Sequence, residues 1–504
     1  MFRLSSCKIY TLLMIVLFVS QQVNANIVNN RYLNLTLEDA VKIAMKNSYR
    51  IRQLKLGIER TKLLLKAERA ELKSKIYMNL KAPEIQALSE YQWNSELYRE
   101  EVVRRNTRLW QMEFSISQPV IIFGYPTNGY LSFNSKLYRY LQKNGDNDVS
   151  YYNRYFIEYV QPLFQPNILK NNLEKARLDL QEAELNYLQD IMGLLDNVSD
   201  SFFDLFYLTY MDQIHRNYLL NLKQAKHNVQ QIVNHDPTRK IEKNQIEIEL
   251  ANARENLLQN QSNIRREIIQ LKNRLGLNNL DTLGVSTKIF FIPLKIDTNK
   301  AIELAYRFNP RIRLLSNRRK QNEIEVENVK GENGINVNLD LTYGIEKQDD
   351  DYRYLWQESD NSYSVTLNAY IPLWDWGQRK ARIEAARINL KRTDLYIKET
   401  KERIRTEIIN IISNLEEYQR RVQNMQKNIQ IAKNITLQSK EQYLLKKISL
   451  QDLLRIISSQ KETETNFLKV YINYRKNLVQ LMQKTYYDFE NDRDLIEQFK
   501  INSS

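Results

Sequence analysis

Residues able to bind metals or act as nucleophiles are few in this sequence, and their spacing assembles no site. The three histidines, His215, His227 and His235, are twelve and eight residues apart, so they do not share one helix face as metal ligands would. Phosphate loops, nucleophile elbows and paired-carboxylate sites are also missing from the sequence. We therefore expect no enzyme, no cofactor and no metal site. For His215, beside Asp212 on a helical seam, we expect a polar contact that sets helix register.

The N-terminus has the pattern of a cleaved secretory signal peptide, predicted at 1–25. Arg3 and Lys8 form its basic region, 10–19 is its apolar core, and small residues precede position 26. The only cysteine, Cys7, lies inside this segment, so the mature chain is expected to lack disulfides. No other run approaches ~18 apolar residues, so insertion into a membrane would require a barrel of strands.

The composition favours long helices. The 504 residues include only 11 glycines and 9 prolines, whereas 27% of them are charged. The formal charge of +14 could indicate nucleic acid or an anionic membrane surface as a partner. Lys and Arg are, however, spread along the predicted helices among Glu and Asp. We therefore expect solvated helix surfaces and no nucleic-acid partner.

The segment 361–371 is predicted to be a strand, because apolar and polar residues alternate along it. Pro372 would end this strand, and Gly377 would free the backbone to enter the helix that follows. Trp374 and Trp376 lie in the same junction. Pro162 occupies the equivalent position in an earlier strand-to-helix junction.

Two very long helices are predicted, at 166–233 and 377–446. Apolar residues recur along each in steps of four and three, which is the pattern of a coiled-coil seam. A helix of about 70 residues is ~100 Å long, so a compact globular domain has no room for it. The predicted seams are Tyr187, Ile191, Leu194, Val198, Ser201, Leu205 and Leu208, and then Ile404, Ile408, Ile411, Leu415, Tyr418, Val422, Met425, Ile429 and Ala432.

The order of elements predicts an internal duplication. Residues 40–44 correspond to 301–305 at an offset of 261, and residues 161–164 correspond to 371–374 at an offset of 210. The first repeat therefore has 51 extra residues between its outer strands, the difference between the two offsets.

The predicted boundaries follow from this duplication. The first repeat, 26–276, comprises helices within 35–74, strands within 75–163, the long helix 166–233 and a helix at 239–275 that Gly276 ends. Thr36 and Asp39 have the pattern of a capping box at the start of its first helix. A linker at 277–298 precedes the second repeat, 299–484, with helices at 299–331, strands within 334–372, the long helix 377–446 and a helix at 450–484. A tail covers 485–504. In the first repeat, strands are expected to start at 76–80 and to lie near 109–118, 129–140 and 152–162, while the charged residues 84–107 are expected to be irregular.

These elements and three short motifs resemble the TolC family of outer-membrane efflux proteins over nearly the whole mature chain. The first-repeat motif of the family is echoed by Glu242, Glu247, Glu249, Leu250, Ala251 and Ala253. Its second-repeat motif is echoed by Tyr443, Ser449, Asp452, Leu453 and Leu454. The Pro-Leu-Trp-Asp-Trp-Gly run at 372–377 is also typical of the family.

The resemblance implies a mainly α-helical homotrimer with a membrane β-barrel. The helices of three chains would form one hollow tube, and four strands from each chain would close one shared antiparallel barrel of twelve. The segment 335–345 fits such a wall, with apolar residues on one face and polar residues on the other. The alternative is one half of a soluble sandwich. Aromatic residues on or beside these strands fit membrane-interface girdles, although strands are also enriched in aromatics; they are Trp110, Tyr159, Phe164, Tyr343, Tyr370, Trp374 and Trp376.

The resemblance also implies a gate at the periplasmic mouth of the tube. Asp452 falls where the family has an aspartate that rings the constriction, and Tyr443 falls where a tyrosine helps to hold it shut. Glu242 is assigned to the same gate. Arg455 departs from the family pattern, because it could neutralise the ring formed by Asp452. The alternative for these residues is that they are solvated side chains at helix ends.

The turns near 234–241 and 443–451 are implied to dock a periplasmic adaptor that is coupled to an inner-membrane pump. The docking residues would be Asp236, Pro237, Thr238, Lys446, Lys447, Ile448 and Ser449. Lys446 replaces the usual turn glycine. The implied location is the outer membrane of a Gram-negative bacterium, with the helices in the periplasm. The sequence identifies neither the cargo nor the pump.

Two other protein classes share the long helices. A secreted coiled-coil structural or adhesion protein would explain them, but would leave the strands and the duplication unexplained. A periplasmic adaptor has one helical hairpin per chain and lacks alternating amphipathic strands.

Overall fold

The computed structural model describes residues 32–496, apart from 145, 278–281 and 333. The predicted signal peptide lies outside this part of the chain. Within the described residues, no helix combines the length and the apolar character needed to cross a membrane.

The chain divides into two compact units, and each unit takes residues from both predicted repeats. The first unit comprises residues up to 51, 191–301 and from 408 onward, and the second comprises 52–190 and 302–407. The two longest helices contribute to both units. The predicted repeats are therefore not separate compact bodies.

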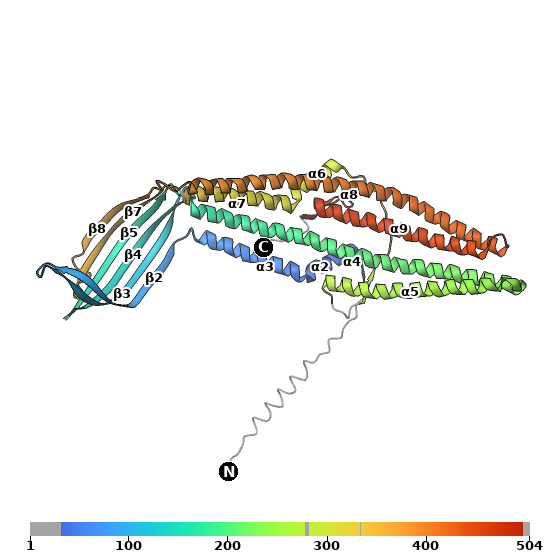
Figure 1. Ribbon diagram of the computed structural model, residues 1–504, viewed down its shortest axis with the longest axis horizontal. Helices are drawn as coiled ribbons and strands as arrows, with labels where there is room; N and C mark the ends of the chain where they lie inside the picture. Colours follow the sequence, from blue (N-terminus) through green and yellow to red (C-terminus); the bar gives the residue numbers. More distant parts are fainter. Residues whose placement is uncertain (1–31, 145, 278–281, 333, 497–504) are drawn as a thin grey trace, which may run out of the picture. The chain divides into compact units, whose positions relative to one another are not determined.

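Six strands of the second unit form one antiparallel sheet (Figure 1). Their order in the sheet is β2–β3–β4–β5–β7–β8, so β2 and β8 are its two edges. Every neighbouring pair is antiparallel. The bounds are β2 Lys75–Asn94, β3 Arg99–Ile122, β4 Tyr125–Asn144, β5 Asp146–Leu163, β7 Asn336–Asp349 and β8 Asp360–Tyr370.

The two faces of this sheet differ in polarity, as the alternation of the sequence requires. One face has exposed apolar side chains from all six strands, and we call it the apolar face; it includes Ile76, Met78, Leu80, Met112, Leu131, Phe133, Ile157, Tyr343, Ile345, Tyr363, Val365 and Leu367. The other face has buried polar side chains, including Ser115, Ser132 and Asn134. Soluble sheets bury the apolar face instead.

One expectation about the strands is wrong. Residues 84–107 are not irregular, because β2 and β3 pair through them as a hairpin from Glu84↔Leu109 to Asn94↔Arg99. The sheet of one chain contains six strands, as many as the strand segments predicted in the two repeats, whereas four strands per chain are expected in a barrel wall. The additional hairpin is β3–β4, since the repeat matches β2 with β7 and β5 with β8.

The helices of the second unit are held together by polar pairs between α7 (Pro310–Glu332) and its neighbours. Asn171 of α4 (Ile168–His235) donates from its amide to the Asn328 side chain at 2.7 Å. On α8 (Gln378–Leu444), Asp394 accepts from the Arg319 guanidinium at 2.7 Å. The shorter helices of the chain are α2 Leu37–Asn47, α3 Tyr49–Ala70 and α6 Thr298–Phe308.

α4 buries five of the seven seam residues that the sequence predicts, and α8 buries four of nine. On α4 (Ile168–His235) the residues Tyr187, Ile191, Val198, Ser201 and Leu205 are buried, and on α8 (Gln378–Leu444) the buried residues are Ile404, Ile408, Leu415 and Val422. Ile412 is buried on α8 where Ile411 was expected. α5 (Lys240–Leu275) ends at Gly276, whose φ of +63° and hydrogen bonds to the preceding turn form the expected C-cap.

Two small sheets complete the first unit. β1 (Tyr32–Leu35) pairs in parallel with β6 (Thr282–Val285), which lies inside the predicted linker. The C-terminal segment follows α9 (Leu450–Thr485) and forms a hairpin of β9 (Tyr487–Asp488) and β10 (Arg493–Asp494).

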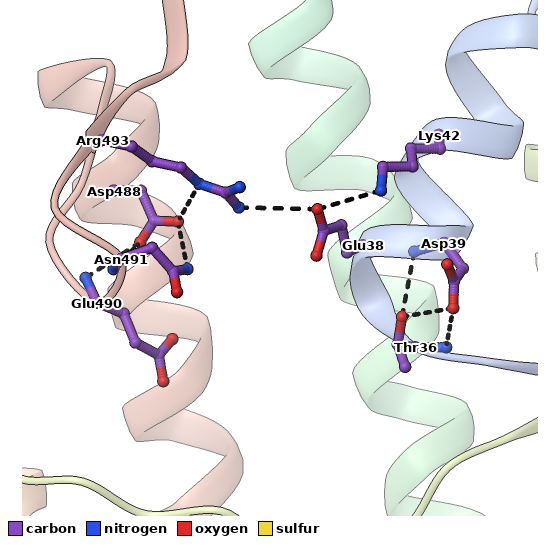
Figure 2. A network of polar contacts seen from close by, with 8 residues as sticks. All are labelled: Thr36, Glu38, Asp39, Lys42, Asp488, Glu490, Asn491 and Arg493. Carbon is purple, nitrogen blue, oxygen red and sulfur yellow. Dashed lines mark hydrogen bonds and ion pairs between the residues drawn. The ribbon is translucent and has the colours of Figure 1, made fainter. Parts of the chain in front are cut away.

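An ion pair connects this C-terminal hairpin to the start of α2 (Figure 2). Arg493 lies 3.1 Å from Asp488 within the hairpin and 3.8 Å from Glu38 of α2. Thr36 and Asp39 form the capping box predicted at the start of that helix. These contacts anchor the last described residues of the chain to the N-terminal helix.

Candidate functional site

The two helical hairpins of the first unit end in turns that lie close together. The α4–α5 hairpin turns through a short 3₁₀ helix, η1 (Pro237–Arg239), and the α8–α9 hairpin turns through 445–449. Tyr443, two residues before the second turn, donates from its hydroxyl to Glu242, three residues after the first turn, at 2.6 Å. The predicted docking residues of both repeats are therefore neighbours.

The first turn is built on Asp236 and Pro237. The Asp236 carboxylate caps η1 by accepting hydrogen bonds from the Thr238 hydroxyl at 2.5 Å and from its backbone N–H at 3.3 Å. The hydroxyl contact is the largest cause of the lowered Asp236 pKa. Pro237 occupies the first position of η1, where a missing N–H costs nothing.

The second turn uses a left-handed residue. Lys446 has a φ of +57°, donates from its N–H to the Tyr443 carbonyl, and is followed by a Lys447 N–H bond to the Gln442 carbonyl. This pair of bonds is the Schellman motif, which usually has glycine at the left-handed position. Ser449 then caps α9. Lys446 therefore adopts a left-handed backbone conformation that favours glycine, which causes some backbone strain.

Tyr443 joins the two hairpins at the level of these turns. Its side chain is fully buried, and its hydroxyl donates to the Glu242 carboxylate at 2.6 Å. Arg239 donates from Nε to Glu242 at 2.7 Å and lies 5.6 Å from the centre of the Tyr443 ring. Burial is the main reason that the Tyr443 pKa is raised, and the Glu242 hydrogen bond adds to it. We call Tyr443, Glu242 and Arg239 the latch.

A hydrophobic cluster lies beside the latch and contains residues from all four helices. Fully buried side chains of this kind contribute about 1.5–3 kcal/mol each to stability. We call it the tip cluster; its members are Tyr218, Leu222, Ala225, Val229, Ile232, Ile246, Leu250, Ala253, Tyr443, Leu450, Leu453 and Ile457.

Asp452, the other predicted gate residue, is at the surface. Its carboxylate accepts from the Ser449 hydroxyl at 2.7 Å, and the Ser449 hydroxyl accepts from the Asp452 N–H at 3.1 Å. Arg455 lies 3.2 Å away. The Ser449 contact is the largest cause of a lowered Asp452 pKa. The structure thus pairs Asp452 with Arg455, as the sequence suggested, but within one turn of α9 and apart from the latch.

Two residues of this region were not identified from the sequence. Arg239 completes the latch. Its position three residues before Glu242, at a helix start, could have predicted their ion pair. Lys440 of α8 donates to the side-chain oxygens of Asn221 and Gln224 on α4, at 2.8 Å and 2.6 Å. Burial lowers the Lys440 pKa. No sequence pattern indicates this second polar link between the hairpins.

Two histidines have described side chains, His215 and His227, and both lie on α4. Among the described residues, no group of three His, Cys, Asp or Glu side chains is placed to hold a metal ion. The buried Nδ1 of His215 makes no hydrogen bond to the described residues, so the register-setting contact expected of this residue stays a prediction. Asp212 makes a polar contact by accepting from Gln261 of α5 at 3.3 Å.

The strand-to-helix junction at 371–377 is an exposed, capped turn. Asp375 accepts hydrogen bonds from the backbone N–H groups of Gly377 and Arg379. These two bonds cap the start of α8. Trp376 and Gly377 both have positive φ, at +54° and +83°. The structure thus gives Gly377 the freedom that the sequence predicted. Pro162 lies two positions before Phe164, whose φ is also positive at +61°.

Aromatic side chains mark both ends of the sheet. At the helix end, Phe164, Tyr370, Trp374 and Trp376 are exposed, and the two tryptophans make an edge-to-face contact at 5.6 Å. At the far end, an aromatic group includes Trp110, Tyr151, Tyr155, Tyr352 and Trp356. Tyr352 and Trp356 are exposed at the far end, whereas Trp110, Tyr151 and Tyr155 are half-buried.

Comparisons with known proteins agree with this architecture. Residues 336–484 match the family described as Outer membrane efflux protein. No curated protein matches the sequence. The fold is similar to that of the CmeC outer membrane channel of Campylobacter jejuni, with 16% identity and a TM-score of 0.61 over 92% of this chain and 88% of that one.

Two further solved structures are similar over comparable lengths. The Neisseria gonorrhoeae MtrE outer membrane channel, in its open state, is 14% identical, with a TM-score of 0.61 over 94% of this chain and 96% of that one. The outer-membrane channel OprN is 14% identical, with a TM-score of 0.65 over 89% of each chain. At these identities the structural similarity shows the fold alone.

Proposed function

We propose that this chain is a gated exit duct in the outer membrane. Its match to the outer membrane efflux protein family agrees with the predicted resemblance to the TolC family. Three copies would form the duct. Their sheets would make a barrel in the outer membrane of a Gram-negative bacterium, and their helices would form a periplasmic tube. Solutes would pass through without chemical change, so no catalytic group is needed.

The observation that carries this proposal is the polarity of the six-stranded sheet. Its apolar face is exposed on every strand, while Ser115, Ser132 and Asn134 are buried on the opposite face. Lipid outside and water inside is the environment that satisfies such a sheet. A coiled-coil adhesin or a periplasmic adaptor does not require a sheet with an exposed apolar face.

The latch is proposed as the closed state of the gate. Tyr443, Glu242 and Arg239 tie the α8–α9 hairpin to the α4–α5 hairpin of the same chain. Opening the hairpins at the turns would break a buried hydrogen bond to a carboxylate, which is worth about 1.5–3 kcal/mol per chain, in addition to any tip-cluster contacts that separate with it. Such a link is strong enough to hold a mouth shut and weak enough for a partner to open it.

Asp452 is proposed to line the mouth without controlling it. Three symmetry-related carboxylates concentrate negative potential and favour cations. Here each carboxylate has Arg455 at 3.2 Å, which offsets its charge. The pair therefore predicts a duct with weak ion selectivity.

The two neighbouring turns are the proposed docking site for a periplasmic adaptor coupled to an inner-membrane pump. Asp236, Pro237 and Thr238 present one turn, while Lys446, Lys447, Ile448 and Ser449 present the other. Both turns adjoin the latch, so binding there can change the spacing of the hairpins. An adaptor that separates the turns would release Tyr443 from Glu242.

The proposal is tested on detergent-purified full chain by native mass spectrometry and planar-bilayer recording. We expect a mass of three chains and discrete conductance steps after insertion. Cells expressing the protein should release it with the outer-membrane fraction. A monomer or dimer that never conducts would overturn the proposal and favour the coiled-coil class.

A further inference from the structure

The six-stranded sheet of each chain leaves two edges, β2 and β8, without a partner among the described residues. Both edge strands are exposed along most of their described length, and β8 has a single half-buried residue, Ser362. In lipid, every backbone N–H and C=O group needs an internal partner, so open edges are not tolerated there. If the duct proposed above is correct, something must pair with both edges.

We propose that β8 of one chain pairs with β2 of the next, so that three copies close a barrel of eighteen strands. This inference rests on the proposed function. It departs from the twelve-stranded wall expected from the sequence, because all six strands of each chain enter the wall. The occupant of each edge is a second copy of the same chain.

Strand direction permits this closure. Neighbouring strands alternate in direction across the whole sheet. Five steps separate β2 from β8, so these two strands run in opposite directions. β8 of one chain can therefore continue the antiparallel order into β2 of the next, and a head-to-tail contact of this kind forms a ring when its rotation closes.

The stagger of the sheet also fits a closed wall. A row of paired residues crosses it through Ile76, Ile116, Phe133, Ile157, Tyr343 and Tyr363. Ile76 is one residue from the start of β2, whereas Tyr363 is seven residues from the end of β8, and both strand ends lie at the helix edge of the sheet. The stagger is six residues over five steps. At ~3.3 Å per residue and ~4.8 Å per strand this corresponds to a strand tilt of about 40°, inside the 35–45° range of closed barrels.

The polarity of the edges agrees with the same pairing. Leu367 and Val365 put apolar side chains on the apolar face at one edge, and Met78 and Leu80 do so at the other. Pairing β8 with β2 therefore continues one apolar surface around the ring. A barrel of eighteen strands is about 1.5 times as wide as one of twelve, because diameter grows roughly linearly with strand number.

The stagger is about one residue per strand. Applying the same shift between β8 of one chain and β2 of the next predicts which of their residues are paired. Leu367 is three residues from the end of β8, so its partner lies about four residues from the start of β2. Met78 and Leu80 are the residues of the apolar face at that level. Opposed residues in such a pair have Cβ atoms about 4.5–5.5 Å apart, close enough for cysteines to be linked after small adjustments.

The test is disulfide cross-linking in the full chain with Cys7→Ser, which removes the only native thiol. Leu367→Cys is combined with Met78→Cys or Leu80→Cys, and in matched controls with Leu131→Cys or Phe133→Cys on β4. Leu367→Cys alone is the background. After mild oxidation, we expect dimer and trimer bands on denaturing gels for a β8–β2 pair, and monomer for the β4 controls and the single variant.

The outcomes separate this inference from the proposed function. Cross-linking of β8 to β4 would mean that β2 and β3 lie outside a twelve-stranded wall, which overturns the closure. A native trimer in which neither pair links would also overturn it. A native mass of one chain would overturn the proposed function itself.

Discussion

The two hairpin turns of the first unit perform the same task with different backbone geometry. The first turn, at Asp236, Pro237 and Thr238, contains no left-handed residue and relies on an aspartate cap. The second turn relies on a left-handed Lys446 and on the Ser449 cap of α9. Both turns adjoin one tip cluster and one latch. The difference shows that the packing of the tip cluster beside a turn can stabilise a backbone conformation that the residue in the turn, here Lys446, disfavours.

The largest effect is expected from the packing that the two turns share. Leu453→Ala removes a fully buried side chain of the tip cluster and should lower the free energy of unfolding of this region by about 2–5 kcal/mol. Ile248→Ala, at an exposed site of α5, is the matched control and should change it by less than about 0.5 kcal/mol. Hydrogen exchange of the amides at both turns measures the change. Equal exchange in the two variants would mean that the cluster does not hold the turns.

Lys446→Gly should have a smaller effect of opposite sign. Glycine adopts positive φ without strain, whereas other L residues there cost roughly 1–2 kcal/mol. We expect the midpoint of urea unfolding to rise, with a gain of about 1 kcal/mol after the greater entropy of unfolded glycine is subtracted. Thr238→Gly in the first turn should lower stability, because no positive φ is needed there. A loss of stability in both variants would contradict the assigned difference.

The smallest effect concerns the acidic caps of the two turns. The pKa values of Asp236 and Asp452 are both lowered from 3.8 by their hydrogen bonds to Thr238 and Ser449. A carboxyl whose folded pKa is depressed stabilises the fold above its unfolded pKa, and that contribution disappears as pH falls through the folded pKa.

Both turns should therefore exchange backbone amides faster below about pH 4, relative to Asp236→Asn and Asp452→Asn variants that lack this titration. The wild type and each variant are compared at pH 3 and pH 6 by hydrogen exchange. A wild-type turn whose protection follows that of its Asn variant at both pH values would show that its carboxylate does not stabilise it.

The sequence predicted the helical parts of this fold well because their signals are local. The three- and four-residue steps along α4 and α8, the Thr36 capping box and Gly276 all depend on residues within one or two turns. Tyr443 was assigned to a gate from a motif, and that role stays a prediction. Its contact with Glu242, 201 residues away, depends on how two hairpins pack and was not derivable from spacing.

The strands at 84–107 were missed for a physical reason. Seven residues, Arg99–Arg105, pair only with β2, beyond the end of β4. A two-stranded hairpin has solvent on both faces, so no apolar alternation is required to form it. Backbone pairing between β2 and β3 determines the structure of this hairpin. Its charged side chains show no apolar alternation, so the hydrophobic pattern does not predict a strand.

The latch is tested most directly by single-channel recording of Tyr443→Phe. This change removes only the hydroxyl that donates to Glu242, a bond worth about 1.5–3 kcal/mol, so the ratio of open to shut states should rise at least about tenfold. Tyr474→Phe is the matched control, since it removes a buried hydroxyl that donates to the Ile292 carbonyl, away from the turns. We predict small conductance for the wild type and Tyr474→Phe, and large conductance for Tyr443→Phe. Conductance of Tyr443→Phe equal to that of the wild type would contradict a gate held shut by this latch.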